Sequence, residues 1–131
     1  MPDLLFMETM DARIEEFRKM ADRYAELIGA RLEKALETHK DVFLLTHVPP
    51  WTESTRDRGT FFENFWLPYN TNTRMGHAIE AVMRDRHKKH CTVLSGHTHT
   101  ETWVRVRRNI DCHVSKANYY GIFRTTDHIY I

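Results

Sequence analysis

In the stretch Val93-Leu94-Ser95-Gly96-His97-Thr98-His99, a short apolar run is followed by a glycine and then by two histidines with one residue between them. A similar stretch, Leu44-Leu45-Thr46-His47-Val48-Pro49-Pro50, stands upstream of it. Each stretch predicts a short buried strand that ends in a hydroxyl residue and an imidazole. In open α/β sheets, ligands bind beyond the carboxyl ends of the strands, so two such parallel strands would direct their imidazoles into one cleft. The pattern therefore predicts a transition-metal site with His47, His97 and His99 as ligands.

The segments around these stretches predict an alternation of helices and strands. Apolar residues recur at three- and four-residue steps over 9–38 and over 73–90, as in amphipathic helices. Strands are predicted at 41–46 and 91–95. The order helix, strand, helix, strand predicts an α/β fold with crossover connections.

The apolar faces of the two helices are expected to cover the core. The first face comprises Ile14, Phe17, Ala21, Tyr24, Ile28, Leu32 and Ala35, and the second comprises Ala78, Ile79, Val82 and Met83. Asn72 or Thr73 could cap the second helix.

After His99 the pattern changes to alternating residues. Trp103, Val104 and Val106, followed by Ile110, Cys112 and Val114, predict two antiparallel strands that turn near Arg108-Asn109. Residues 121–131 predict another hairpin.

The connection over residues 48–70 is long for a compact domain, and loops of that length tend to be lids or binding segments. Its six aromatic residues, Trp51, Phe61, Phe62, Phe65, Trp66 and Tyr69, are interpreted mainly as packing under the loop. Arg56 and Arg58 could meet the oxygens of a phosphate, or could simply be solvated.

Composition predicts one soluble globular domain over 1–131, with 41% hydrophobic and 28% charged residues. A formal charge of +1 argues against a general nucleic-acid surface. The first residues do not have the pattern of a signal peptide, and no apolar run has the length of a membrane span. Cys91 and Cys112 lack metal-ligand spacing and are expected to be free, mostly buried thiols in a cytoplasmic protein.

The stretches Thr46-His47-Val48-Pro49-Pro50 and Ser95-Gly96-His97-Thr98-His99 resemble the last two sequence blocks of the calcineurin-like metallophosphoesterases. The resemblance extends between and beyond these blocks and covers most of the chain. It implies a two-sheet sandwich flanked by helices, of which this chain supplies the carboxyl-terminal part.

The opening blocks of that family, Asp-x-His, Gly-Asp-x-x-Asp and Gly-Asn-His, are missing, since none of the 5 glycines is followed by Asp or Asn. The triplets Asp85-Arg86-His87 and Asp111-Cys112-His113 are interpreted as chance matches because neither ends an opening strand. The chain could be a truncated fragment, the product of a misassigned start, one half of a split gene or a decayed enzyme.

The resemblance implies phosphoester hydrolysis at two divalent transition metals, Mn, Fe or Zn. It implies that His47 and His97 bind one metal and that His99 binds the other. It also implies that Asn118 lies near the active cleft, although the segment around Asn118 could instead be a structural turn. The acid histidine lies in a missing block, so no catalytic residue is assigned in this chain. The isolated chain is expected to bind at most one metal weakly and to show little phosphatase activity.

Truncation would expose a sheet edge and an apolar face, so a homodimer or a complementary amino-terminal half is expected as a partner of the chain. One alternative function is a non-catalytic metal-binding or assembly protein derived from a phosphoesterase. A cupin-like barrel is a third possibility, because His97-Thr98-His99-Thr100-Glu101 resembles the His-x-His and glutamate of that fold, although the glutamate comes too soon after the pair.

Overall fold

The computed structural model describes residues 9–55 and 70–116. The first element is the helix α1 (Met10–Thr38), which begins where the side chain of Thr9 accepts a hydrogen bond from the backbone N–H of Ala12. The helix ends where His39 turns into an extended conformation. These bounds confirm the predicted helix to within one residue.

The strand β1 (Asp41–Leu45) follows, and the helix α3 (Thr73–Met83) returns the chain to the strand β2 (His90–Ser95). The strands β1 and β2 pair in parallel, which confirms the predicted crossover. Asn72 caps α3, since its side chain accepts a hydrogen bond from the backbone N–H of Met75.

The prediction that the second helix continues to residue 90 was wrong, because α3 ends at Met83. The amide of Asn109 donates to the carbonyls of Met83 and Arg86, and the ammonium of Lys89 donates to two carbonyls at the end of α1. These tertiary contacts provide hydrogen-bond donors for the carbonyl groups at the ends of the two helices. The helix α3 therefore stops early, and β2 begins at His90.

The strands β3 (Thr102–Arg107) and β4 (Ile110–Val114) form the predicted antiparallel pair around Arg108 and Asn109. β4 also pairs in parallel with β2, so the sheet has the order β1-β2-β4-β3. A short 3-10 helix, η2 (Thr52–Ser54), follows β1. The predicted hairpin over 121–131 lies outside the described residues.

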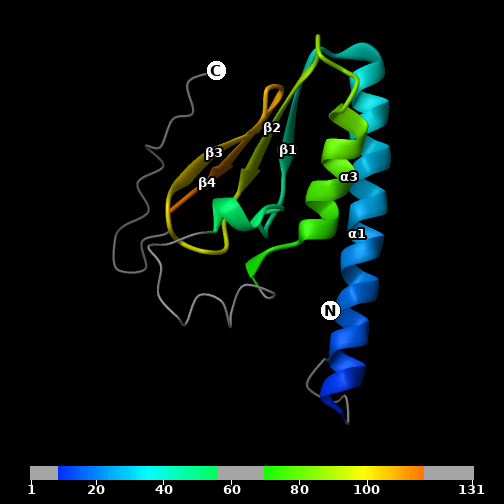
Figure 1. Cartoon of the computed structure of the whole chain (residues 1–131), viewed down its shortest axis with the longest axis vertical. Helices are drawn as coiled ribbons and strands as arrows, with labels where there is room; N and C mark the ends of the chain where they lie inside the picture. The colour runs from blue at the N-terminus through cyan, green and yellow to red at the C-terminus, as the bar shows by residue number, and fades with distance from the viewer. Residues whose placement is uncertain (1–8, 56–69, 117–131) are drawn as a thin grey trace.

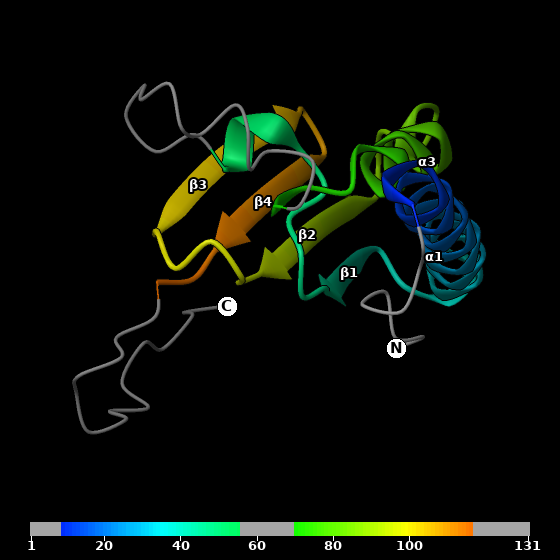
Figure 2. The ribbon, with the colours of Figure 1, turned by 90° about the horizontal axis from the view of Figure 1, so that it is seen from below.

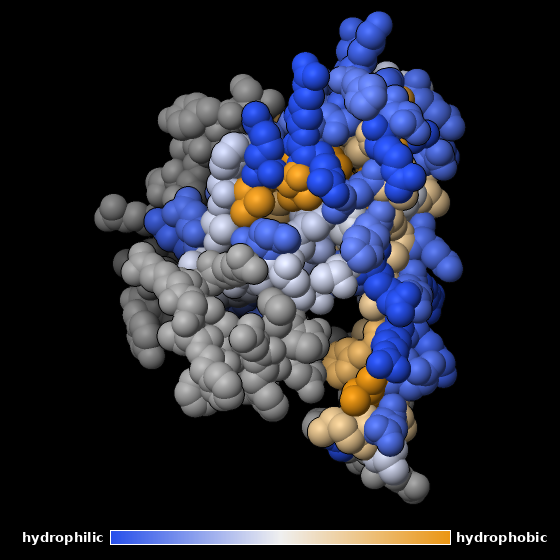
Figure 3. Space-filling view, viewed as in Figure 1, coloured by the Kyte–Doolittle hydropathy of each residue, from blue (hydrophilic) through white to orange (hydrophobic). Residues whose placement is uncertain are grey.

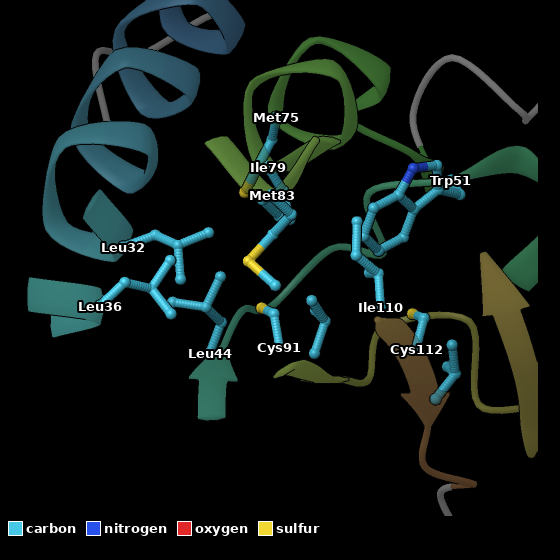
Figure 4. Close-up of a cluster of buried hydrophobic side chains, with 12 residues drawn as sticks. Leu32, Leu36, Leu44, Trp51, Met75, Ile79, Met83, Cys91, Ile110 and Cys112 are labelled. Carbon is cyan, nitrogen blue, oxygen red and sulfur yellow. The ribbon is translucent and has the colours of Figure 1, made fainter. Parts of the chain in front are cut away.

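Both helices lie on the same side of the sheet (Figure 2). The core between them gathers side chains from α1, α3, three strands and the loop after β1, as Figure 4 shows. Its buried members are Leu32, Leu36, Leu44, Trp51, Met75, Ile79, Met83, Cys91, Val93, Ile110, Cys112 and Val114.

The inward faces of the helices were predicted only in part. Leu32, Ile79 and Met83 are fully buried, as expected, but Phe17 and Tyr24 are exposed. The reason is length, because the 11 residues of α3 can cover only part of the 29 residues of α1. Figure 1 shows the amino-terminal half of α1 continuing past both α3 and the sheet.

The other face of the sheet carries exposed apolar side chains, including Phe43, Leu45 and Trp103. Among residues 9–55 and 70–116, no helix lies over this face, and the strands form one sheet. The predicted α/β class is therefore confirmed, whereas the two-sheet sandwich stays a prediction. Within the same ranges, no helix combines the length and the apolar character needed to cross a membrane.

Candidate metal centre

The two histidine-bearing stretches meet at one end of the sheet because β1 and β2 are parallel and in register. Leu45 lies opposite Leu94 at the carboxyl ends of the strands. Beyond this pair the backbone N–H of Thr46 donates to the carbonyl of Leu94 at 2.9 Å, and that of Gly96 donates to the carbonyl of His47 at 3.2 Å. The ladder thus extends into the loops and fixes the position of one loop relative to the other.

The side chains of His47 and His97 are in direct contact. The Nε2 atom of His47 lies 3.1 Å from the Nδ1 atom of His97, and the ring centroids are 4.8 Å apart at an interplanar angle of 70°. Two neutral imidazoles at this distance share one hydrogen bond, in which one ring donates and the other accepts.

The same separation suits two ligands of one metal ion. With metal–nitrogen bonds of about 2.0–2.1 Å, two ligands at octahedral or tetrahedral angles are about 2.9–3.4 Å apart. The chemistry of the donors also fits, since neutral imidazole is a common ligand of Zn, Fe and Mn sites. His47 and His97 therefore have the nitrogen–nitrogen spacing of two neighbouring ligands.

The turn after β2 places strained residues at this point. His97 has φ 69° and His99 has φ 60°, whereas Gly96 does not adopt the left-handed conformation. The left-handed residues of this turn are therefore the histidines and not the glycine. A left-handed residue with a side chain costs about 1–3 kcal/mol, and such strain concentrates at ligand clamps and active sites.

His99 follows His97 by two residues on the same turn. Its side chain is exposed, as is that of His47. In the part of the chain that the structure describes, no three His, Cys, Asp or Glu side chains form a group that could hold a metal. The structure thus brings His47 and His97 together and does not bring His99 into one group with them.

The loop after His47 is held firmly by α3. Pro49, Pro50 and Trp51 are buried, and the indole N–H of Trp51 donates to the Glu80 carboxylate at 2.9 Å. A Cβ atom on Gly76 would lie 2.5 Å from the Pro50 carbonyl oxygen, so only glycine permits this close approach. The burial of Trp51 confirms its interpretation as a packing residue, and it lies in the hydrophobic core.

The remaining predicted site residues, Arg56, Arg58 and Asn118, lie outside the described residues. The interpretation of the cysteines is confirmed, since Cys91 and Cys112 are free and buried. Burial raises the pKa of the Cys91 thiol from its usual 9.0 to about 12, and burial also raises the pKa of Cys112. Both thiols are therefore protonated and unsuited to act as nucleophiles at neutral pH.

Sequence reasoning missed a second polar group on the open face of the sheet. The Asp111 carboxylate lies 3.1 Å from the Nε2 atom of His90 and accepts a hydrogen bond from Arg105 at 2.9 Å. The sequence signal that could have indicated this group is the alternation of side chains along β4, which places Asp111 on the opposite face of the sheet from the buried Cys112. Without the register of β2, β4 and β3, the three partners could not be identified.

Comparison of the chain with protein-family models, curated proteins and solved structures gives no match in any of the three.

Proposed function

We propose that this chain is the carboxyl-terminal part of a metal-dependent phosphoester hydrolase of the calcineurin-like type. In this proposal His47 and His97 bind one ion of a dinuclear site, and His99 binds the other. The observation that carries the proposal is the distance of 3.1 Å between the two imidazole nitrogens.

The pairing of residues supports this assignment in detail. The family resemblance assigns His47 and His97 to the same ion, and these two are the histidines in contact. It assigns His99 to the other ion, and His99 lies two residues after His97 on the same turn, where both residues have a left-handed φ.

Two divalent ions about 3.5–4 Å apart would polarise the phosphoryl oxygens and supply a hydroxide near neutral pH. The part of the chain described here would hold and orient the ligands. Hydrogen bonds between the loops position His47 relative to His97, and the Trp51 packing fixes the entry to the following loop. Each imidazole must be neutral at the ligating nitrogen, so acidification would weaken metal binding.

The missing ligands would come from a complementary amino-terminal half. The open sheet face, with Phe43, Leu45 and Trp103 exposed, would then pack against a second sheet and complete the sandwich implied by the resemblance. The two imidazoles alone leave most coordination positions of an ion to water, which is why the isolated chain should bind metal weakly and turn over little substrate.

Calorimetric titration of the purified chain with Zn²⁺ and Mn²⁺, alongside hydrolysis of p-nitrophenyl phosphate, tests the proposal. We expect weak binding of one ion, binding at least about tenfold weaker in His97→Ala, and negligible hydrolysis. The matched control is His77→Ala, which removes an exposed imidazole from α3 and should leave binding unchanged. Binding that is equal in His97→Ala and the parent chain would contradict the assignment of the metal ligand.

The rate of hydrolysis distinguishes an incomplete hydrolase site from a complete one and from a non-catalytic metal-binding protein. Rapid hydrolysis that is abolished by His97→Ala would contradict the assignment of this chain as an incomplete site. One tightly bound zinc without turnover, and without gain of activity when an amino-terminal half is supplied, would favour a non-catalytic metal-binding protein instead.

A further inference from the structure

A pocket of about 200 Å³ opens at the end of the sheet that is opposite to the contact between His47 and His97. It lies between the loop after α3 and the turn that joins β3 to β4, which Figure 1 shows at the same end of the molecule. The strand β2 runs from this end over 6 residues, so about 17 Å separates the pocket from the loop that carries His97. The lining residues are His87, Lys88, Lys89, His90, Arg108 and Asn109.

The lining of this pocket carries cations and no carboxylate. It consists of two lysines, one arginine, two histidines and one asparagine. Asp111 contacts the lining at His90, but Arg105 also binds this carboxylate, at 2.9 Å. Figure 3 shows hydrophilic side chains gathered at this upper end of the molecule. An anion in the pocket would therefore meet an excess of positive charge.

Two of the lining side chains serve the fold itself. The ammonium of Lys89 donates to two carbonyls at the end of α1, at 2.7 and 2.9 Å. The amide of Asn109 donates to two carbonyls at the end of α3, at 3.0 and 3.2 Å. These donors compensate the negative carboxyl ends of both helices. They also hold the loop after α3 against the turn between β3 and β4, so the walls of the pocket are fixed relative to each other.

Three further lining side chains have no such task. The side chains of His87, Lys88 and Arg108 are exposed, and within 9–55 and 70–116 no hydrogen bond or ion pair engages them. Their neighbours differ, since Arg86 and Arg107 form ion pairs with carboxylates on the two helices at 2.9 and 2.6 Å. The pocket thus gathers cationic groups that no described carboxylate neutralises.

We propose that this pocket binds a phosphate group. The planar guanidinium of Arg108 can donate two parallel hydrogen bonds to phosphate oxygens, and the ammonium of Lys88 supplies a second positive charge. The imidazole of His87 can donate one N–H to the same anion. Pockets for drug-sized ligands have volumes of about 300–1,000 Å³, so this smaller one fits a phosphate group and not a whole nucleotide. The site is separate from the candidate metal centre and requires no metal ion.

Titration of isotope-labelled chain with sodium phosphate at neutral pH, followed by the backbone amide signals in NMR spectra, tests the site. Ionic strength is held constant with NaCl, because general screening would otherwise shift many signals. We expect saturable shifts at Lys88 and Asn109 with a dissociation constant on the order of 1 mM, since the charges are exposed, and no comparable shift at Gly76. Shifts that do not saturate, or no shifts at these amides, would overturn the proposal.

Substitutions of the unengaged cations test which groups bind the anion. Arg108→Gln should weaken phosphate binding by at least about tenfold, and Arg108→Lys should weaken it less because the charge remains. Lys88→Gln is a second variant on the other wall of the pocket and should also weaken binding. The matched control is Arg31→Gln, which removes an exposed arginine from α1. Equal effects of Arg108→Gln and Arg31→Gln would overturn the proposal, because phosphate would then respond only to the overall charge.

The phosphate group could belong to a free ion or to an ester, and a parallel titration with phosphoserine distinguishes the two. Tighter binding of phosphoserine than of inorganic phosphate would support the phosphate site and assign its ligand to the esters. Weaker or equal binding of phosphoserine would support a site for the free ion. Binding of serine as tight as that of phosphoserine would overturn the proposal, because the phosphate group would then contribute nothing.

Discussion

The imidazole of His47 contacts that of His97 at 3.1 Å, although 50 residues separate them in the chain. The contact exists because two parallel strands in register end at the same level and their loops exchange backbone hydrogen bonds. The two nitrogens have the spacing of two ligands on one ion. Substituting each histidine and measuring the metal affinity therefore tests whether the two side chains share an ion.

If both histidines bind the same ion, each substitution should weaken the same binding event. His47→Ala and His97→Ala should each lower the zinc affinity by at least about tenfold, and the double variant should bind more weakly than either, because it keeps neither imidazole. Competition of each variant with a chromogenic chelator measures these affinities. A single variant that keeps the parent affinity for zinc would mean that the two imidazoles act at independent sites.

The helix α3 approaches the loop after β1 so closely that Gly76 cannot be replaced. Gly76→Ala should destabilise the fold, because the new Cβ atom would overlap the Pro50 carbonyl and contact the Trp51 indole. We expect a loss of about 1–3 kcal/mol in the free energy of unfolding, as for other overpacked sites. Urea titration followed by circular dichroism measures it.

Gly29→Ala is the matched control for this substitution. Gly29 also lies in a helix, but its added Cβ atom would meet the Cβ atom of Ala78 at an ordinary 3.8 Å. Alanine should therefore stabilise α1 by up to about 1 kcal/mol through its helix propensity. Equal effects of the two substitutions would contradict the close approach at Gly76.

The buried thiols should make the fold sensitive to alkaline pH. Burial raises the pKa of Cys91 from 9.0 to about 12, so the unfolded chain loses this proton at lower pH than the folded chain does. Stability is therefore fully present below pH 9 and declines between pH 9 and 12, by up to about 1.4 kcal/mol per pH unit for this thiol.

Comparison with Cys91→Ala isolates this contribution from those of other groups that titrate at high pH. The free energy of unfolding of the parent chain should fall more steeply than that of the variant between pH 9 and pH 11, as measured by urea titration. Parallel slopes would show that Cys91 ionises alike in the folded and unfolded states.

The sequence predicted which helices and strands form better than it predicted where α3 ends and which side chains of α1 are exposed. The heptad-like spacing of α1 and the alternation around Arg108 and Asn109 are local signals, and both helix and hairpin are confirmed. The end of α3 was wrong because it depends on Asn109 and Lys89, which reach it from distant parts of the chain. Local periodicity cannot include such contacts.

The candidate site was likewise predicted only in part from the sequence. The position of His47 and His97 at strand ends followed from the two similar stretches, and the parallel register then brings them into contact. The strained conformation of His97 and His99 could not be predicted, because Gly96 is the residue that ordinarily adopts a left-handed turn. The alternation of β4 places Asp111 on the open face, but its contacts with His90 and Arg105 could not be predicted, because they require three strands in register.

X-ray absorption at the zinc edge, on chain loaded with less than one equivalent of zinc, tests the shared metal ion most directly. The proposal predicts two imidazole ligands in the parent chain, and one in His47→Ala and in His97→Ala, with light oxygen donors completing the coordination. An imidazole count that is the same in the parent chain and in both variants would contradict it.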